Sequence, residues 1–497
     1  MDGCSEDDPE EEVKKITIDP ITRLEGHGKI EIFLDDKGNV KNAYLQIPEL
    51  RGFEVFSLGR AAEEMPRITP KICGVCPTAH HMASTKALDD LYKIEPTETA
   101  RKIREIIYCA FMVEDHALHF YFLGSPDFIV GPGAPAGSRN ILGVIEKVGL
   151  ETGKRVIEMR KRLRSIITFF GGRVIHPVCG LPGGVSKGLD ENERKNIEGI
   201  ARDAIDFAKF SLDAFRNIVL KNEEYVKLIT GDIYRHRTYY MGLVDKNNKV
   251  NFYDGKIRVV NPDGREFAKF DVKDFGDHIA EHKEEWSYVK FPYLKKIGWK
   301  GFTDGEKSGV YRVAPLARLN ASDGMATEYA DKEHDAMFKT LGGKPSHHTL
   351  AFHWARLVEM LYAAERLLEL SSDKSITSKD LRNLPERKPE EGIGVVEAPR
   401  GTLIHHYRTD ERGVLNYVNL LVATYGNAAA ISMSITKAAE NLIKKGQVSD
   451  EILNKVEMAF RAYDPCMACA THSLPGQMPL TLNIYDHERH LIKKLSR

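Results

Sequence analysis

Four of the seven cysteines form two pairs near opposite ends of the 497-residue chain. Two residues separate Cys73 from Cys76, and two separate Cys466 from Cys469. This gap lets both sulfurs of a pair face one ion, and four thiolates suit a soft or borderline metal such as zinc, iron or nickel. On spacing alone, a structural zinc site and a redox-active cysteine pair both remain possible.

Three neighbouring features favour a reactive metal centre over a structural zinc site. Pro77 follows Cys76 and begins a helical pattern, so the helix dipole would stabilise a thiolate at Cys76. His80 lies one turn further along the same face, where its ring N–H could reach the sulfur; a buried histidine bonded to a carbonyl is the alternative. Finally, Asp464 and His472 place a carboxylate and an imidazole beside the second pair, which a zinc ribbon does not need.

Both motifs resemble the signature motifs of [NiFe] hydrogenase large subunits. They read Lys71-Ile-Cys73-Gly-Val-Cys76 and Asp464-Pro-Cys466-Met-Ala-Cys469-Ala-Thr-His472. The resemblance extends along most of the chain, except for the acidic start and residues 249–272. It includes residues 19–27, 51–54, 115–120, 176–184, 314–318 and 397–401.

The resemblance implies a role for each of the four cysteines. Cys73 and Cys466 would bind nickel as terminal ligands, and Cys76 and Cys469 would bridge nickel to an iron. The iron in this family also carries carbon monoxide and cyanide, which maturation enzymes make. No residue spacing could reveal those ligands.

Residues that enclose the carbon monoxide and cyanide in the family match Pro399, Arg400 and Thr424. Arg400 also has a physical argument of its own, because an always-charged guanidinium is a suitable donor to a cyanide nitrogen. A salt-bridged core arginine is the alternative interpretation. Asp115 resembles a carboxylate that supports Arg400.

Glu25 resembles the glutamate that exchanges protons with the terminal thiolate, here Cys466, and a carboxylate can do so within hydrogen-bond reach. From its own sequence context, Glu25 would be a surface turn residue. Glu54 and His472 resemble ligands of a magnesium ion. Since magnesium usually takes oxygen ligands, the family resemblance alone carries the imidazole assignment.

The reaction that the resemblance implies is reversible heterolytic cleavage of dihydrogen to protons and electrons. The thiolate of Cys466 would take the proton and pass it to Glu25, with Arg400 as a second candidate base. Cys4, Cys109 and Cys179 match no metal position and are too few for an iron–sulfur cluster, so an iron–sulfur small subunit is the expected partner. Cys109 lies in an apolar helical pattern and is expected to pack as a small hydrophobe.

Residues 471–479 resemble the soluble, multisubunit hydrogenases that exchange electrons with NAD(P) through flavin-containing diaphorase subunits, sometimes with ferredoxin as well. A deazaflavin-linked or heterodisulfide-reductase-linked hydrogenase is the alternative. Two interpretations come from other classes. A relative of the quinone-binding subunit of complex I would lack the cysteine ligands, and a zinc-stabilised interaction protein would hold zinc alone.

The predicted elements that position these residues give an α+β fold, mostly a bundle of long helices with a small N-terminal sheet. Alternation predicts strands at 13–18, 29–34 and 40–47, with a hairpin turn at 35–38. Apolar residues at helical intervals predict long helices, at 97–123, 150–170, 191–221, 346–371 and 435–463.

Two further stretches are expected at the surface, and neither suggests a domain boundary. Residues 249–272 combine β-like runs with turns and are interpreted as a surface insertion. Residues 383–394, rich in Pro, Glu and Arg, resemble an exposed connection. We therefore expect a single domain over residues 1–497.

Composition narrows the classes of protein and of partner. The 71 basic and 72 acidic residues nearly cancel, which argues against nucleic acid or an acidic membrane as the general partner. No apolar run is long enough for a membrane span, and the acidic segment 1–12 is unlike a signal peptide and is expected to be a disordered tail. A cytoplasmic protein is predicted. The family resemblance further implies that residues 473–497 are a maturation extension, which an endopeptidase removes after His472.

Overall fold

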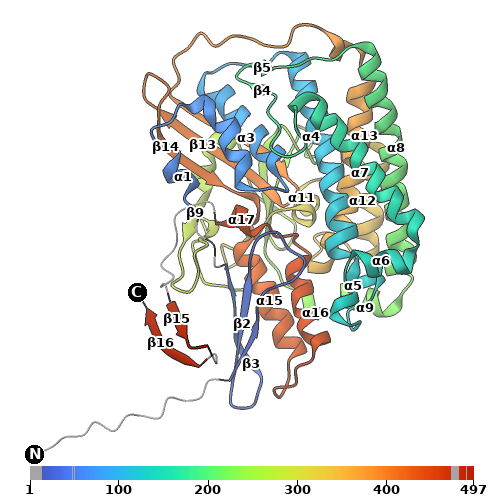
Figure 1. Ribbon diagram of the computed structural model, residues 1–497, viewed down its shortest axis with the longest axis vertical. Coiled ribbons are helices and arrows are strands. Elements are labelled where there is room, and N and C mark those ends of the chain that lie inside the picture. The colour runs from blue at the N-terminus through green and yellow to red at the C-terminus, as the bar shows by residue number, and fades with distance from the viewer. Residues whose placement is uncertain (1–13, 48, 50, 472–480, 488–489, 497) are drawn as a thin grey trace, which may run out of the picture.

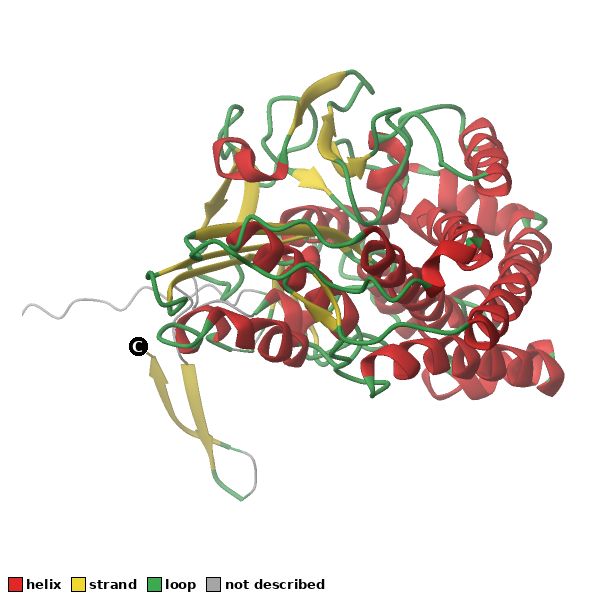
Figure 2. Ribbon diagram, turned by 90° about the horizontal axis from the view of Figure 1, so that it is seen from above, coloured by secondary structure: helices red, strands yellow, loops and turns green. Residues whose placement is uncertain are grey.

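The computed structural model describes residues 14–47, 49, 51–471, 481–487 and 490–496. Long helices gather on one side and the larger sheets on the other, with the short helix α17 (Met467–Ala470) near the middle (Figures 1 and 2). Most buried apolar side chains belong to one continuous cluster that extends through both sides. The predicted α+β class is therefore confirmed. The acidic segment 1–12, Cys4, His472 and residues 473–480 lie outside the described residues.

The N-terminal sheet follows the prediction closely. Strands β1 (Lys15–Ile18), β2 (Lys29–Leu34) and β3 (Val40–Gln46) pair antiparallel in chain order. The Asp35 carboxylate accepts hydrogen bonds from the backbone N–H groups of Lys37 and Asn39, which closes the predicted turn.

Four of the five predicted helical runs form the body. Helices α4 (Glu98–Leu118) and α8 (Glu191–Phe215) each continue into a π-helical segment, His119–Gly124 and Arg216–Leu220. Helix α13 (Phe352–Ser372) packs against both and is buried almost throughout, and α7 (Leu150–Gly171) packs against α4. The run predicted at 346–371 therefore begins as an α-helix only at Phe352, because a short 3-10 turn precedes it.

The prediction of a continuous run over 435–463 is wrong. The structure has α15 (Ala428–Leu442) and α16 (Asp450–Arg461) instead. Lys445 and Gly446 between them take left-handed backbone conformations, with φ of 52° and 70°. Ser449 then caps the second helix by accepting a hydrogen bond from the backbone N–H of Ile452. Both helices have apolar residues at helical intervals, so the sequence pattern did not reveal the break between them.

A central antiparallel sheet has no counterpart in the sequence analysis. It consists of β12 (Glu391–Ala398), β13 (Gly401–Thr409) and β14 (Leu415–Leu421), so residues 391–394 are strand rather than exposed connection. Both faces of β13 are covered, which removes the alternation that marks a half-buried strand. Helix α3 (Pro77–Leu91) lies so close that a Cβ on Gly392 would meet the carbonyl oxygen of Ala87 at 2.2 Å.

Residues 249–272 are built into the fold, which corrects the prediction of a surface insertion. Strands β7 (Lys256–Val260) and β8 (Glu266–Phe270) extend a sheet with β6 (Tyr239–Val244) and β11 (Tyr311–Arg312). Val250, Phe252 and Ile257 are buried, and the exposed positions include turn residues and Lys256, Glu266 and Lys269 of the strands. Period and turn chemistry located the strands but carried no information about what covers them.

The remaining elements are short. The helices are α1 (Phe53–Phe56), α2 (Met65–Ile68), α5 (Pro126–Ile129), α6 (Ile141–Val148), α9 (Glu223–Thr230), α10 (Phe275–His278), α11 (Pro315–Ala321), α12 (Glu328–Thr340) and α14 (Ala423–Gly426). The strands are β4 (Gly180–Leu181), β5 (Gly184–Val185), β9 (Ile279–His282), β10 (Phe291–Leu294), β15 (Thr481–Tyr485) and β16 (Leu491–Ser496). The β15–β16 hairpin projects away from the body (Figures 1 and 2). Among the described residues, no helix combines the length and the apolar composition that a membrane crossing requires.

Candidate metal centre

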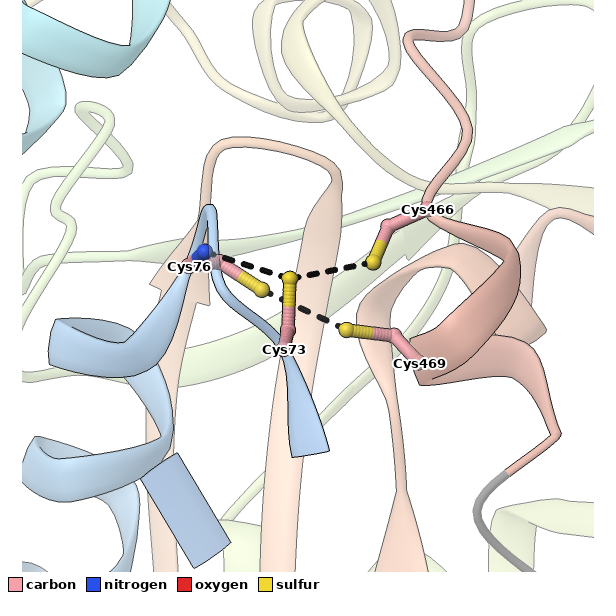
Figure 3. A group of neighbouring side chains, drawn as sticks. All are labelled: Cys73, Cys76, Cys466 and Cys469. Atoms are coloured by element: carbon pink, nitrogen blue, oxygen red, sulfur yellow. Dashed lines mark hydrogen bonds between the residues drawn. The ribbon is translucent and has the colours of Figure 1, made fainter. Parts of the chain in front are cut away.

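The two cysteine pairs meet in the interior. The four sulfurs lie within 4.8 Å of one another, and all four cysteines are buried. The Sγ atoms of Cys73 and Cys466 are 3.2 Å apart, and those of Cys76 and Cys469 are 3.3 Å apart (Figure 3). Each pair therefore contributes one sulfur to each close contact.

Local structure around the first pair matches the predicted helix start. Cys76 is the N-cap of α3, and Pro77 occupies its first turn. The backbone N–H groups of Val75 and Cys76 donate to the Cys73 sulfur at 3.2 and 3.3 Å. The turn therefore supplies partial positive charge to this sulfur.

The second pair sits on a short helix that is joined to the N-terminal segment. The backbone N–H of Met467 donates to the carbonyl oxygen of Glu25 at 2.9 Å, and the backbone N–H of Cys466 donates to the Thr424 hydroxyl at 3.1 Å. Asp464, just before this turn, adopts a φ of 56°. The turn is thus held from two other parts of the chain.

Burial makes it costly to ionise these thiols together. It raises the pKa of Cys466 and of Cys469 well above the usual thiol range, and the neighbouring sulfurs add to the effect at Cys466. Four thiolates at these distances need a cation between them. The donor set therefore fits a soft metal ion.

Glu25 contacts the terminal sulfur of the second pair. The Cys466 thiol donates to Glu25 Oε2 at 2.8 Å, and the backbone N–H of Ala468 donates to the same oxygen at 3.2 Å. Burial raises the pKa of Glu25, and the negative charge of Cys73 raises it further. A half-buried carboxyl group with a raised pKa can hold and release a proton beside the sulfur.

Arg400 lies between two buried carboxylates. Its Nη1 is 3.1 Å from Asp115 Oδ2, and its Nη2 is 2.8 Å from Asp464 Oδ2. Burial raises the pKa of both carboxyl groups, and the guanidinium opposes that shift. Within the described part of the chain, Arg400 Nε has no hydrogen-bond partner although it is buried. One donor of this arginine is therefore available for a ligand.

A small cavity adjoins Cys76 and Cys469 rather than the other two sulfurs. Thr424, Pro399 and Arg400 line it, and these are the residues that the family resemblance assigns to the surroundings of the diatomic ligands. The rest of the lining is largely apolar and comprises His80, Ala398, Leu403, Val422 and Ala423. An apolar pocket with an arginine suits small ligands that accept hydrogen bonds.

His80 reaches a sulfur of the second pair. Its Nε2 is 3.6 Å from the Sγ of Cys469, whereas the sequence analysis named Cys76, one helical turn earlier, as the sulfur within reach. Spacing along α3 predicts which residues share its face, but it cannot show that a sulfur from α17 packs against that face.

The predicted magnesium site is only partly within the described residues. Glu54 lies in α1 and accepts a hydrogen bond from the backbone N–H of Leu420 at 2.7 Å. Since His472 is outside the described residues, the pairing of the two as magnesium ligands stays a prediction.

A buried ion network behind the cavity was missed as a functional feature. Arg318 binds Glu359 through two nitrogens, both at 2.6 Å, and binds Glu397 at 2.8 Å. It also donates to the carbonyl oxygen of Ala398, and Tyr108 donates to that of Glu397. The network fixes the backbone just before Arg400. The sequence signal that could have revealed this network is the presence of Glu359 and Glu397 among mostly apolar neighbours.

Comparison with known proteins identifies the family. A sequence model described as nickel-dependent hydrogenase matches residues 51–132 and 228–472, more than half of the chain. The chain belongs to this family. It is therefore a hydrogenase, an oxidoreductase that acts on dihydrogen. A second model, described as HoxL-like, matches residues 15–50.

Several hydrogenase subunits are similar over nearly the full chain. An F420-non-reducing hydrogenase iron-sulfur subunit of Archaeoglobus profundus is 50% identical, and the match covers 97% of this chain and 99% of the relative. An F420-non-reducing hydrogenase subunit of Methanothermobacter marburgensis is 42% identical, with 97% and 100% covered. The beta subunit of the NAD-reducing hydrogenase HoxS of Cupriavidus necator is 37% identical, again with 97% and 100% covered.

Solved structures agree with this assignment. The crystal structure of an NAD⁺-reducing [NiFe]-hydrogenase in the H₂-reduced state superposes with a TM-score of 0.86 at 35% identity, covering 92% of this chain and 99% of that one. A Ni-Fe-Se hydrogenase from D. vulgaris Hildenborough has a TM-score of 0.72 at 23% identity, with 93% and 100% covered, and supports the fold alone. The hydrogenase is thus a large subunit of the [NiFe] type.

Proposed function

We propose that this large subunit binds a nickel–iron centre on its four central cysteines and cleaves dihydrogen heterolytically there. The observation that carries the proposal is the convergence of four buried sulfurs beside an apolar, arginine-lined cavity. Cys73 and Cys466 would be terminal nickel ligands, and Cys76 and Cys469, which line the cavity, would bridge to iron.

The residues present fit this group. Four thiolates match the preference of nickel and iron. Arg400 Nε, a donor without a partner among the described residues, matches the hydrogen-bond acceptor of a cyanide. Thr424 and Pro399 would complete the enclosure of the cyanide and carbon monoxide ligands. When bound, the nickel–iron centre would polarise dihydrogen and accept its two electrons.

Cys466 and Glu25 are the residues we assign to proton transfer. The thiolate of Cys466 would receive the proton, and the Glu25 carboxylate, at hydrogen-bond distance from that sulfur, would accept it next. Arg400 is the second candidate base. It is less suited, because a guanidinium paired with two carboxylates holds its proton tightly. Asp115 would keep Arg400 in place rather than exchange protons itself.

The electrons require a partner. Cys109 and Cys179 are separate buried cysteines, so the described residues offer no second cysteine cluster able to hold an iron–sulfur group. An iron–sulfur small subunit would receive the electrons, and a magnesium ion would bind Glu54 and His472 near the end of the processed chain.

The final electron acceptor has two candidates. The relative with 50% identity is named as F420-non-reducing, which favours an acceptor other than F420, such as the heterodisulfide-reductase-linked alternative. The HoxS relative and the structure with a TM-score of 0.86 are both NAD-reducing, which favours NAD(P) and diaphorase partners. The higher identity leads us to put the first candidate ahead. Reduction of NAD⁺, NADP⁺, F420 and a heterodisulfide by the purified complex under dihydrogen distinguishes them.

Infrared spectroscopy of the purified complex tests the metal assignment. Metal-bound carbon monoxide and cyanide absorb where protein does not, so bands in that window are expected. Elemental analysis should find about one nickel per large subunit and more than one iron, because the iron–sulfur small subunit carries iron of its own. Zinc as the sole metal, without such bands, would refute the nickel–iron centre and support a zinc-stabilised protein instead.

We also propose that residues 473–497 are removed after His472 by an endopeptidase during maturation. The described part of this segment, the β15–β16 hairpin, stands away from the body, as expected of a segment that is not part of the core (Figure 1). Processing would then let His472 take up its position as a ligand. Intact mass of the active large subunit is the test, and full activity in a chain that still ends at Arg497 would contradict the claim.

A further inference from the structure

A line of polar side chains extends from Cys469 into the core. His80 Nε2 is 3.6 Å from the Cys469 sulfur, and His80 Nδ1 is 3.2 Å from His405 Nε2. His405 Nδ1 is in turn 2.6 Å from the Tyr407 hydroxyl oxygen, which lies 3.0 Å from Ser84 Oγ. Each step is a hydrogen-bond distance, so the five groups are connected without interruption.

Helix α3 and strand β13 supply the side chains of this line, and the normal repeat of each element places its two residues on one face. His80 and Ser84 are four residues apart on α3 and so share a face of the helix. His405 and Tyr407 are two residues apart on β13 and so share a face of the sheet. His406 between them points to the other face, where it contacts Glu391 at 2.7 Å. The packing of α3 on the central sheet therefore assembles the line.

The side chains that form this line are buried. His80 is 1% exposed, and Ser84, His405 and Tyr407 are 0% exposed. Thr69, four residues before Cys73, bonds to the carbonyl oxygen of His80 and so ties the same helix turn to the first cysteine loop. Burial of every member favours an orienting role over exchange of protons with water.

The chemistry at one end sets the direction of all the hydrogen bonds. A metal-bound thiolate can only accept, so His80 must present Nε2–H to Cys469 and keep Nδ1 as an acceptor. His405 must then donate from Nε2, which leaves its own Nδ1 in need of a donor. The Tyr407 hydroxyl can turn its proton toward that nitrogen, since it lies within reach of both His405 and Ser84.

We infer that His405 and Tyr407 are positioning residues that fix the tautomer of His80, so that it donates a hydrogen bond to the bridging thiolate of Cys469. The inference rests on the proposed nickel–iron centre. An N–H donor draws electron density from a thiolate and makes it a weaker donor to its metal. Without the phenol, nothing from Tyr407 opposes the other tautomer, in which His80 Nε2 carries no proton.

The test is the infrared spectrum of the assembled complex carrying Tyr407→Phe, a change that removes only the hydroxyl. We expect the carbon monoxide band to move to lower wavenumber, because a thiolate with a weaker hydrogen bond leaves more electron density on iron for the carbonyl to accept. Tyr417→Phe is the matched control. Tyr417 lies on the neighbouring strand β14, is 39% exposed and contacts His406 on the other face. Its spectrum should match that of the wild type.

A second matched pair of variants is needed because a water molecule in Tyr407→Phe could replace the hydrogen bond of the lost hydroxyl. His405→Leu breaks the line next to His80 and should shift the band at least as far, whereas His406→Leu on the outer face should not shift it. If neither Tyr407→Phe nor His405→Leu shifts the band, the inference is overturned while the proposed function stands. Absence of the bands from the wild-type complex would overturn the proposed function, and this inference with it.

Discussion

Cys466 caps the short helix α17 and Cys469 lies within it, three residues further on, yet their surroundings differ in kind. The sulfur of Cys466 contacts Glu25, a half-buried carboxyl group whose pKa burial raises. The sulfur of Cys469 contacts His80, which is buried and bonds in turn to the buried His405. Cys466 lies beside an acid that can exchange its proton, which suits it to proton transfer. Cys469 lies beside a fixed hydrogen-bond donor, which suits it to lasting metal bridging. Residue type alone therefore does not set a cysteine's role; its neighbour does.

The largest effect should come from Cys466→Ser. Serine is a hard and largely protonated replacement for a soft thiolate, so we expect no hydrogen uptake by the purified complex. Cys179→Ser is the control, because Cys179 is buried apart from the metal site and bonds to His81. That variant should retain most activity. Equal turnover by the two variants would remove the distinction between metal-binding and structural cysteines.

Glu25→Gln separates proton transfer from metal binding. The amide keeps the shape of the side chain but cannot exchange a proton, so hydrogen–deuterium exchange should fall roughly 10²- to 10⁴-fold while the infrared bands persist. Glu31→Gln changes a carboxylate of the N-terminal sheet that pairs with Lys15, and it should leave the exchange rate unchanged. Hydrogen–deuterium exchange at the wild-type rate in Glu25→Gln would show that Glu25 is not needed for proton transfer. The contrast drawn between the sulfurs of Cys466 and Cys469 would then fail.

Acid should destabilise the side of the centre formed by α3, which carries the histidines, more than the side that carries Glu25. Burial lowers the pKa of His81 from 6.5 to about 4, and its Nε2 accepts from the backbone N–H groups of Cys179 and Gly180. Because the folded pKa lies below the unfolded one, this contribution is complete above pH 6.5 and is lost as the pH falls towards 4. The loss should reach about 3 kcal/mol. His81→Gln should lower the melting temperature at neutral pH and flatten its fall over this range; parallel curves would contradict the assignment.

Thr424→Val should have the smallest effect. The hydroxyl accepts a hydrogen bond from the backbone N–H of Cys466, and removing it should cost about 1 kcal/mol. A slightly lower melting temperature with the infrared bands retained is expected. Thr436→Val is the control, since that hydroxyl donates to carbonyl oxygens of Ala43 and Ser432 and lies outside the Cys466 turn. If both variants melt together with the wild type, the hydroxyl does not hold the Cys466 turn.

Sequence reasoning succeeded where a residue acts through its immediate chain neighbours. Cys76 caps a helix because Pro77 follows it, and the N-terminal hairpin turns where Asp35 can bond the backbone. These features depend on local geometry, which spacing encodes.

Contacts between distant segments could be named only by resemblance or not at all. Glu25 and Cys466 are 441 residues apart, and spacing gave no reason to pair them. The line from His80 to Tyr407 was missed for the same cause, since strand β13 is buried on both faces and shows no alternation. His405 and Tyr407 look like ordinary core residues until α3 is placed over the sheet.

The separation of the two cysteine pairs along the chain also sets an order of events during synthesis. Cys73 and Cys466, whose sulfurs touch, are 393 residues apart. A ribosome adding about 5–20 residues per second would need roughly 20–80 s between them. Until then, the growing polypeptide presents only half of its thiol ligands, and the body helices α4, α7, α8 and α13 have all emerged before the second half appears. A centre that needs all four cysteines can therefore be completed only late, after the residues of these helices have been synthesised.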